Sequence, residues 1–265
     1  MRILFIGDVV GSPGIQALQQ TLVQLNQSIK PDLTIANGEN AANNGKGITR
    51  SIVQTFHRLG IDVITLGNHA WAQKEIFDFI ESEPSLIRPA NYPPETPGAG
   101  FVLVKRQQHV VAVCNLMGRS FLEPLDCPFR KADELLATIR SQTSLIFLDF
   151  HGEASSEKIA MGWHLDGRVS AVVGTHTHVQ TAAERILPKG TAYITDVGMT
   201  GAYDGVIGIK RETVLRKFMT QLPVRFEVQN GRWQLNAVAI DIDPNTGKAK
   251  HVNRIRIDDD HPWLD

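Results

Sequence analysis

Cysteine is scarce in this chain, and it has neither a long apolar run nor an excess of charge of one sign. The two cysteines, Cys114 and Cys127, lack CxxC spacing, so no disulfide framework is indicated. No apolar run approaches the roughly 20 residues of a membrane span, and the run at residues 3–6 is too short for a secretory leader. The formal net charge of −1 gives no electrostatic argument for binding to nucleic acid or membranes. We therefore expect a soluble, cytoplasmic protein.

The length and composition are sufficient for one folded domain. With 265 residues, of which 42% are hydrophobic, the chain can bury a substantial core. Internal repeats, low-complexity tracts and interdomain linkers are not evident. We therefore expect a single domain over residues 1–265.

Short apolar runs alternate with amphipathic segments in the first half of the chain, which is typical of βα units. Helices are expected at residues 15–29, 49–59, 73–81 and 130–141. Strands are expected at 3–6, 33–36, 63–66, 145–150 and 169–173, and hairpin strands at 101–104, 110–116, 224–228, 233–242 and 251–257. Residues 84–97 hold five prolines, which excludes a regular helix and favours an extended loop. Because βα units alone would not use the C-terminal hairpins, we expect an α/β fold with two mixed sheets packed face to face and helices outside.

Side chains that can bind metals follow five of these strands directly. They comprise two carboxylates, two carboxamides and four histidines: Asp8, Glu39, Asn40, Asn68, His69, His151, His176 and His178. Ligands of open α/β sheets bind outside the carboxyl ends of the strands, so these side chains can converge although they span about 170 residues. The set is too large for one metal ion, so the sequence predicts a site with more than one.

The motifs that contain these residues resemble those of a known family. They are Gly7-Asp8, Gly38-Glu39-Asn40, Gly67-Asn68-His69, His151-Gly152-Glu153 and Gly174-Thr175-His176-Thr177-His178. This set is similar to the motifs of calcineurin-like metallophosphoesterases, and more closely to those of their YmdB-like branch of bacterial phosphodiesterases. Val10 stands where the superfamily usually has histidine, and Glu39 stands where it has a bridging aspartate. Both departures match the YmdB-like branch.

The resemblance implies a calcineurin-like four-layer αββα sandwich, with two mixed β-sheets flanked by helices, and a dinuclear metal centre. One ion would be held by Asp8, Glu39, Asn40 and His178. Glu39 would bridge to a second ion, which would be held by Asn68, His151 and His176. His69 would then remain as the catalytic residue. The resemblance favours iron, as an Fe2+/Fe3+ pair, with Mn2+ or another divalent transition metal able to substitute, and it is consistent with a homo-oligomer.

These residue types suit the hydrolysis of phosphate diesters. A carboxylate such as Glu39 can bridge two ions because its oxygens offer several lone pairs, and a shell of nitrogen and oxygen without thiolate suits Fe, Mn, Zn or Co. Two ions roughly 3.5–4 Å apart can clamp the phosphoryl oxygens and hold a bridging hydroxide as the nucleophile. His69 could protonate the departing oxygen as a general acid. We therefore expect a metal-dependent phosphodiesterase for cyclic nucleotides, and the resemblance favours 2′,3′-cyclic AMP over 3′,5′-cyclic AMP.

Other functions and simpler structural roles remain open at this point. The same metals would serve a phosphomonoesterase or a nuclease, although linear RNA would normally call for a basic tract. A regulatory protein that keeps the metal centre for structure or ligand sensing is the non-enzymatic alternative. Taken singly, Gly7-Asp8 and Asn68-His69 are ordinary turn signals, Glu39-Asn40 could cap a helix, and His151 could be a core residue.

Several conspicuous segments have a structural interpretation. Residues 11–14 lack the lysine and spacing of a Walker loop, so we interpret them as a turn and helix start. The glycine-rich residues 196–205 are either a close-fitting loop beside the site or a flexible connection. We expect Trp163, Trp233 and Trp263 to serve packing or an interface.

Overall fold

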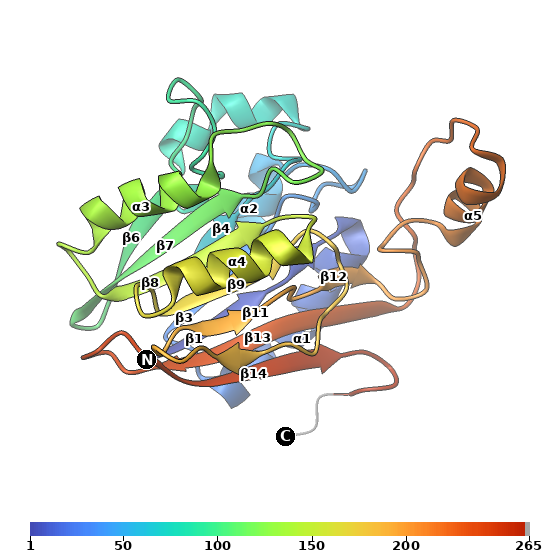
Figure 1. The fold of residues 1–265 in the computed structure, drawn as a ribbon. Helices are drawn as coiled ribbons and strands as arrows, with labels where there is room; N and C mark the ends of the chain where they lie inside the picture. The colour runs from blue at the N-terminus through green and yellow to red at the C-terminus, as the bar shows by residue number, and fades with distance from the viewer. Residues whose placement is uncertain (263–265) are drawn as a thin grey trace.

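Two β-sheets packed face to face form the centre of the protein, and helices cover both outer faces (Figure 1). The computed structural model describes residues 1–262. The strands of the first sheet are, in spatial order, β2 (Asp8–Val9), β12 (Met199–Ala202), β13 (Trp233–Ile242), β1 (Arg2–Ile6), β3 (Leu33–Asn37), β4 (Val63–Thr65) and β5 (Leu86–Ile87), with β14 (Ala249–Ile257) paired to β13. Those of the second are β10 (Arg185–Ile186), β11 (Ala192–Ile194), β9 (Ala171–Thr175), β8 (Leu145–His151), β7 (His109–Met117) and β6 (Phe101–Arg106). The expected architecture of two mixed sheets flanked by helices is confirmed.

The core fills the three spaces between the four layers. Between the sheets, apolar side chains of β1, β3 and β4 meet those of β7, β8 and β9, and the rings of Phe5 and Phe147 lie 5.3 Å apart. The outer face of the first sheet is covered by α1 (Gly11–Ile29) and α2 (Arg50–Arg58), and that of the second by α3 (Pro128–Ile139) and α4 (Ser155–Leu165). Helix α1 buries Leu18, Leu22 and Leu25, whose spacing places them on one face.

The strand directions bring the ends of distant segments to one edge. Strands β1, β3, β4 and β5 run parallel to one another in the first sheet, and β7, β8, β9 and β11 do so in the second. Parallel strands end at the same edge of a sheet. The residues that follow β1, β3, β4, β8 and β9 can therefore meet there.

Some local expectations were wrong. Residues 73–81 form two 3-10 segments, η1 (Lys74–Asp78) and η2 (Ile80–Ser82), because Phe79 between them has φ −143° and buries its ring. Residues 224–228 form no strand, since only Val228 makes a bridge, to Ile209. Helix α4, the helix α5 (Arg211–Thr220) and strands β10, β11 and β12 were not predicted.

The expectations for the proline-rich segment and for the tryptophans are confirmed in part. Residues 84–97 form the expected loop, apart from the two-residue strand β5. Trp233 packs against the core as expected, Trp163 is 51% exposed, and Trp263 lies outside the described residues.

Among residues 1–262, no helix is both long and apolar enough to cross a membrane.

Candidate metal centre

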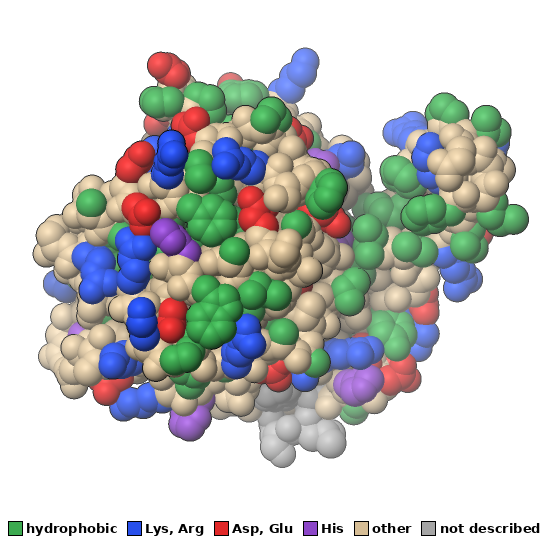
Figure 2. Space-filling model, in the orientation of Figure 1, with side chains coloured by type: hydrophobic (Ala, Val, Ile, Leu, Met, Phe, Trp, Pro, Cys, Tyr) green, Lys and Arg blue, Asp and Glu red, His purple; other side chains and the backbone are tan. Residues whose placement is uncertain are grey.

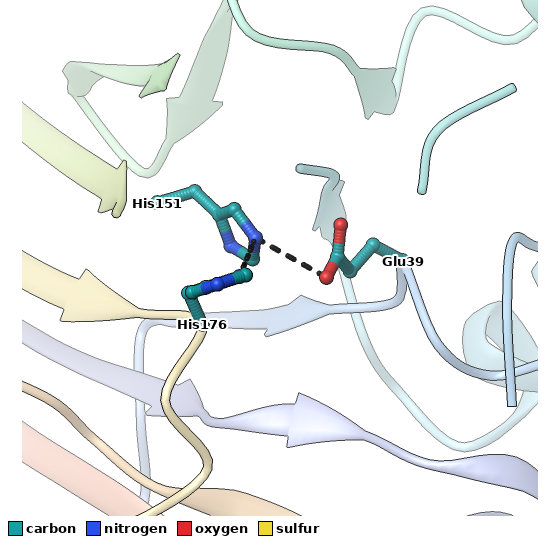
Figure 3. A group of neighbouring side chains, drawn as sticks. All are labelled: Glu39, His151 and His176. Atoms are coloured by element: carbon teal, nitrogen blue, oxygen red, sulfur yellow. Dashed lines mark hydrogen bonds and ion pairs between the residues drawn. The ribbon is translucent and has the colours of Figure 1, made fainter. Parts of the chain in front are cut away.

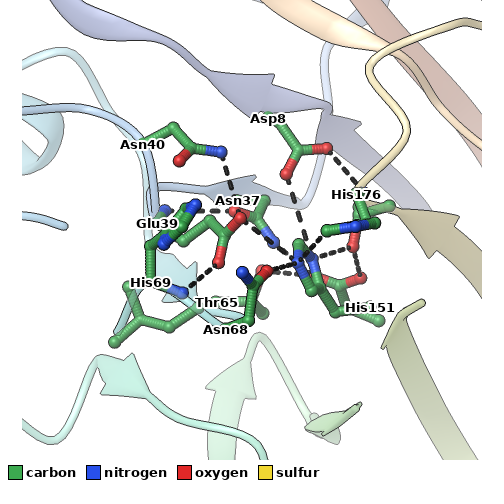
Figure 4. Close-up of polar contacts among 12 residues, drawn as sticks. Asp8, Asn37, Glu39, Asn40, Thr65, Asn68, His69, His151 and His176 are labelled. Atoms are coloured by element: carbon green, nitrogen blue, oxygen red, sulfur yellow. Dashed lines mark hydrogen bonds and ion pairs between the residues drawn. The ribbon is translucent and has the colours of Figure 1, made fainter. Parts of the chain in front are cut away.

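All eight side chains singled out in the sequence lie at the shared carboxyl edge of the two sheets. Asp8 begins β2, and the others follow or end β3, β4, β8 and β9: Glu39, Asn40, Asn68, His69, His151, His176 and His178. Hydrogen bonds and the ion pair between Glu39 and His151 connect them into one cluster, and Figure 4 labels all of its members except His178. Asp8, Glu39 and His151 are almost fully buried, whereas His69, His176 and His178 are partly exposed. The cluster therefore has a buried floor and an accessible side.

His151 is the hub of the cluster. Its Nε2 atom lies 3.0 Å from Nδ1 of His176 and 3.2 Å from Oε1 of Glu39 (Figure 3). It also lies 2.9 Å from Oδ1 of Asn68 (Figure 4). At metal–ligand distances of about 2.1 Å, neighbouring ligands of an octahedral ion lie about 3 Å apart. The spacing around His151 Nε2 therefore matches that of atoms sharing one metal ion.

Two residues outside the eight orient the ring of His151. Its Nδ1 atom lies 2.9 Å from the hydroxyl of Thr175, which in turn donates to Oδ1 of Asp149 over 2.7 Å. Since the hydroxyl proton is directed at the carboxylate, Thr175 accepts from Nδ1–H of His151. Nε2 then turns its lone pair toward the cluster when the ring is neutral. Asp149 also accepts from Thr65 and Asn37 and is fully buried.

Glu153 orients His176 in the same way. Its Oε2 atom lies 3.0 Å from Nε2 of His176, so Nε2–H donates to Glu153 and Nδ1 keeps a lone pair. Four atoms with lone pairs then face one another: Asn68 Oδ1, Glu39 Oε1, His151 Nε2 and His176 Nδ1. A proton or a cation among them is needed to offset their repulsion.

The pKa values of the metal-free cluster reflect this crowding. Burial opposes protonation of His151, but the nearby Glu39 carboxylate outweighs it and raises the pKa to about 9. Burial and the neighbouring His151 lower the pKa of His176 to about 3. Burial favours the protonated form of Glu39, but the charge of His151 and its hydrogen bond lower the pKa to about 2. Burial also raises the pKa of Asp8 to about 7. One proton on His151 thus occupies the place where a cation would bind.

A second group of donors lies beside the first. Nδ2 of Asn40 lies 3.0 Å from Oε1 of Glu39 and 3.2 Å from Nε2 of His178. Nδ1 of His178 donates to the backbone carbonyl of Ile207 over 3.0 Å, which leaves its Nε2 lone pair toward Asn40. Oδ2 of Asp8 accepts from the backbone N–H of His176, whereas its buried Oδ1 has no hydrogen-bond partner among residues 1–262. This second group therefore also offers atoms that can bind a metal ion, and one of them, Oδ1 of Asp8, is buried without a hydrogen bond among the described residues.

Backbone strain supports the position of both histidines after β9. His176 has φ 102° and His178 has φ 65°, which are uncommon for residues other than glycine. Thr177 between them donates its N–H and its hydroxyl to Oδ2 of Asp196, over 3.0 and 2.6 Å. Such strain persists where the surroundings fix it, and it is frequent at functional sites.

His69 borders the cluster without joining its tight contacts. Its backbone N–H donates to Oε2 of Glu39 over 2.9 Å, and burial lowers the pKa of its ring. Among the described residues, the ring itself makes no hydrogen bond. It lines a cavity of about 430 Å³ together with Glu39, Asn40, His176 and His178. The ring is therefore accessible to a ligand in this cavity.

The structure shows the roles of the two glycine-containing segments singled out in the sequence, residues 11–14 and 196–205. Residues 11–14 begin α1, as expected, and Gly14 is needed because a Cβ atom would lie 2.4 Å from the carbonyl oxygen of Thr200. Residues 196–202 are buried and include β12, which pairs with β2 beside Asp8. This part of the glycine-rich segment is therefore a close-fitting strand and loop beside the site. No orienting role was expected for Asp149, Glu153, Thr175 or Asp196, although the sequence motifs contain Glu153 and Thr175. Asp149 could have been found, because it shares its strand face with His151 by simple alternation.

Two stacked sheets with carboxylates and histidines at one edge form the architecture that the resemblance to calcineurin-like metallophosphoesterases implied. The same fold occurs in a candidate 5′-nucleotidase from Staphylococcus aureus, with a TM-score of 0.62 and 15% identity over 98% of this chain and 57% of the other. A family model described as YmdB-like protein matches residues 4–255, so the chain belongs to the YmdB-like family.

Two relatives resemble the chain over nearly its whole length. The 2′,3′-cyclic-nucleotide 2′-phosphodiesterase of Bacillus subtilis (strain 168) is 58% identical over 265 residues, which are 100% of both chains. The crystal structure of a novel phosphatase from Mycoplasma pneumoniae has a TM-score of 0.92 and 36% identity, over 97% of this chain and 93% of the other. The expected family membership is thereby confirmed.

Proposed function

We propose that this protein is a metal-dependent phosphodiesterase that opens cyclic nucleotides, with 2′,3′-cyclic nucleotides as its main substrates. The observation that carries the proposal is the convergence of three donor atoms on Nε2 of His151 within 2.9–3.2 Å. The name of the Bacillus subtilis relative, which is 58% identical, supports the substrate class. The alternatives of a phosphomonoesterase and a nuclease are distinguished by the substrates below.

The donor set fits a dinuclear centre. We assign Asn68, His151 and His176 to one ion, with Glu39 as the bridge to the other. The second ion would be held by Asp8, Asn40 and His178. Oδ1 of Asp8 supports this assignment, because among the described residues it is buried without a hydrogen bond and has only a long contact of 3.9 Å to Nδ1 of His151, and a bound cation would compensate for its lost hydration. For Asn40 to serve as a ligand, its amide must turn by half a rotation, so that Oδ1 takes the place of Nδ2.

The nature of the donors restricts the metal. Nitrogen and oxygen atoms without thiolate suit iron, manganese, zinc or cobalt. We propose iron as the native metal and manganese as a substitute. When bound, such ions supply Lewis-acid stabilisation of the phosphoryl oxygens and acidify water.

The chain itself supplies the proton for the leaving group in this proposal. Water adds its oxygen to phosphorus and releases one proton to solvent, the bond between phosphorus and O2′ breaks, and O2′ takes up a proton from the protein, which regains one from solvent. The product is a 3′-phosphate with a free 2′-hydroxyl. His69 is placed to deliver that proton, because its ring lines the cavity and makes no hydrogen bond to the described protein. Burial lowers its pKa, so its protonated form is a stronger acid than free histidine but is the minor form at neutral pH.

The test compares substrates with poor and good leaving groups. Metal-depleted protein is reconstituted with Fe2+ or Mn2+ and assayed on 2′,3′-cyclic AMP, 3′,5′-cyclic AMP, bis-p-nitrophenyl phosphate and p-nitrophenyl phosphate. His69→Ala should keep the metal, as measured by elemental analysis, and lose about 10²- to 10⁴-fold in kcat on cyclic AMP. The loss should be much smaller on bis-p-nitrophenyl phosphate, because nitrophenolate leaves without a proton. His251→Ala, which removes an exposed histidine of β14, is the matched control.

Specific outcomes would contradict the proposal. A metal-loaded wild-type protein that cleaves no diester would eliminate the phosphodiesterase assignment and favour the regulatory alternative. Preference for the monoester would favour a phosphomonoesterase. Equal losses on both diesters in His69→Ala would show that His69 does not act as the acid.

A further inference from the structure

The residues between β12 and β13 form an arm that projects from the two sheets, and α5 lies at its far end (Figure 1). We call residues 203–232 the arm. Its two ends are joined by a hydrogen bond from the Tyr203 N–H to the Arg232 carbonyl over 2.8 Å and by an ion pair between Arg232 and Asp204 at 2.6 Å. The arm carries an unusual number of exposed apolar side chains, which Figure 2 shows gathered on it: Ile207, Leu215, Phe218, Met219, Leu222 and Phe226.

The arm is fixed to the candidate metal centre at its base. The carbonyl of Ile207 accepts the hydrogen bond from Nδ1 of His178 over 3.0 Å. Ile207 has φ 47°, which is a genuine outlier for a β-branched residue, and such strain requires firm support from its surroundings. At the next residue, Gly208, a Cβ atom would lie 2.9 Å from Cγ1 of Val10. The arm therefore has a defined position relative to His178.

A cavity of about 430 Å³ lies between the arm and the metal centre. Its volume falls in the range of about 300–1,000 Å³ that is usual for small-molecule sites. His69, His176 and His178 line one side, and Ile207, Phe218 and Phe226 line another. One wall thus offers metal-binding chemistry and the other offers aromatic surface.

The side of α5 that lines this cavity is distinct from the rest of the helix. Val214, Lys217 and Phe218 line it, at the spacing of three and four residues that places side chains on one helix face. Leu215 and Met219 do not line it, although they are also exposed. Phe218 is 71% exposed and Phe226 47%, so both aromatic rings retain free surface that a ligand can cover.

We infer that Phe218 and Phe226 form the wall against which the nucleobase of the substrate lies. The inference rests on the proposed function, because a phosphate diester held at the metal centre would direct its nucleoside toward the opposite wall of the same cavity. Aromatic side chains bind bases through their faces, and such contacts tolerate different bases. Lys46 and Lys217, which also line the cavity, complement the negative charge of the phosphate.

The experiment separates the base from the phosphate. The substrates are 2′,3′-cyclic AMP and methyl β-ribofuranoside 2′,3′-cyclic phosphate, which has the same diester and no base. Phe218→Ala and Phe226→Ala should each lower the ratio of kcat/KM for cyclic AMP to that for the baseless diester by roughly 5- to 100-fold, mainly through KM. Calorimetry gives an independent measure: the Kd of adenosine 3′-monophosphate should rise by a similar factor, whereas that of inorganic phosphate should not. Met219→Ala, on the same helix but outside the cavity, is the control.

Three results would overturn the inference. In the first, wild-type protein cleaves both diesters equally well and the phenylalanine variants leave the ratio unchanged, so the phosphodiesterase stands while the base wall fails. In the second, Phe218→Ala, Phe226→Ala and Met219→Ala all change the molar mass measured by light scattering, with base discrimination intact, so the arm is an interface between copies of the chain. In the third, wild-type protein cleaves neither diester, and the proposed function fails together with the inference.

Discussion

Nζ of Lys158 lies 2.7 Å from Oδ2 of Asp196, and both side chains are buried, with exposed fractions of 1% and 0%. The lysine comes from α4 and the aspartate from the segment after β11. Nζ also donates to the carbonyl of Thr175 over 3.2 Å, and the same Oδ2 accepts from Thr177. The pair thus holds the segment that carries His176 and His178 in its strained conformation.

Breaking this ion pair should destabilise both the fold and the metal centre. Lys158→Met leaves the carboxylate of Asp196 buried without its cationic partner, and the loss of one member of a buried ion pair typically costs about 3–5 kcal/mol. The exposed pair between Lys131 and Glu134 is the control, because Lys131→Met should cost at most about 1 kcal/mol. Urea unfolding measures both, and elemental analysis measures the retained metal. Equal costs for the two variants, with metal retained, would show that the buried pair has no positioning role.

Thr175→Val should lower the affinity of the protein for its metal ions. The change keeps the shape of the side chain but removes the hydroxyl that accepts from His151 and donates to Asp149. Loss of such an orienting contact typically lowers metal affinity by about 10- to 100-fold. Competition with a chelator of known affinity measures the change. Thr175→Ser keeps the hydroxyl and should retain most of the affinity, so equal losses in the two variants would contradict the orienting role.

Asp8→Ala should remove metal binding without lowering the stability of the metal-free protein. Oδ2 of Asp8 accepts one hydrogen bond, from the His176 N–H, whereas the buried Oδ1 accepts none among the described residues, so burial of this carboxylate costs the metal-free fold about as much as its contacts return. A metal ion that binds the folded state alone raises Tm. We expect added Mn2+ to raise the Tm of wild-type protein and not that of Asp8→Ala. A clearly lower Tm of the metal-free variant would show instead that Asp8 has a mainly structural role.

The metal-binding residues at the ends of the strands could be predicted from the sequence, because buried parallel strands appear as continuous apolar runs. The run expected at residues 145–150 corresponds to β8 (Leu145–His151), and that at 169–173 overlaps β9 (Ala171–Thr175). A ligand-binding residue directly after such a run must lie at the edge where the strands end. The topology of the fold then supplies the convergence, as it does for Asp8 and His176.

The residues that hold the metal-binding segment in place could not be predicted from apolar runs. Lys158 and Asp196 are 38 residues apart, and nothing local in either segment predicts that their side chains meet. The arm, residues 203–232, was not predicted either, because its pattern of apolar residues does not reflect burial in the core. Most of its apolar residues face a cavity and solvent instead of the core. Apolar and charged residues alternate at 224–228, as in a strand, but no described strand pairs with this segment.

The ion pair between Arg2 and Asp241 should make stability depend on acid pH. It joins paired residues of β1 and β13, with Nε 2.6 Å from Oδ1 and side-chain exposures of 42% and 26%. The hydrogen bond from Arg2 lowers the pKa of Asp241, and His251 and the amino terminus add to the effect. Because the pKa is lower in the folded protein than the usual value of about 3.9, the stabilisation is present above pH ~4 and is lost as the pH falls through the folded value.

Asp241→Asn should therefore cost about 1 kcal/mol or less at pH 7, since the pair is partly exposed, and the cost should shrink as the pH falls through the lowered pKa of Asp241. Urea unfolding at several pH values measures this difference. Asp32 also lies close to Arg2, as an acceptor for its backbone N–H, and this contact is present with and without the Asp241→Asn substitution. Arg2→Met provides the internal control. In that background Asp241→Asn should add little at any pH, and a cost that stays the same with and without Arg2 would show that the charge of Asp241 acts through another group.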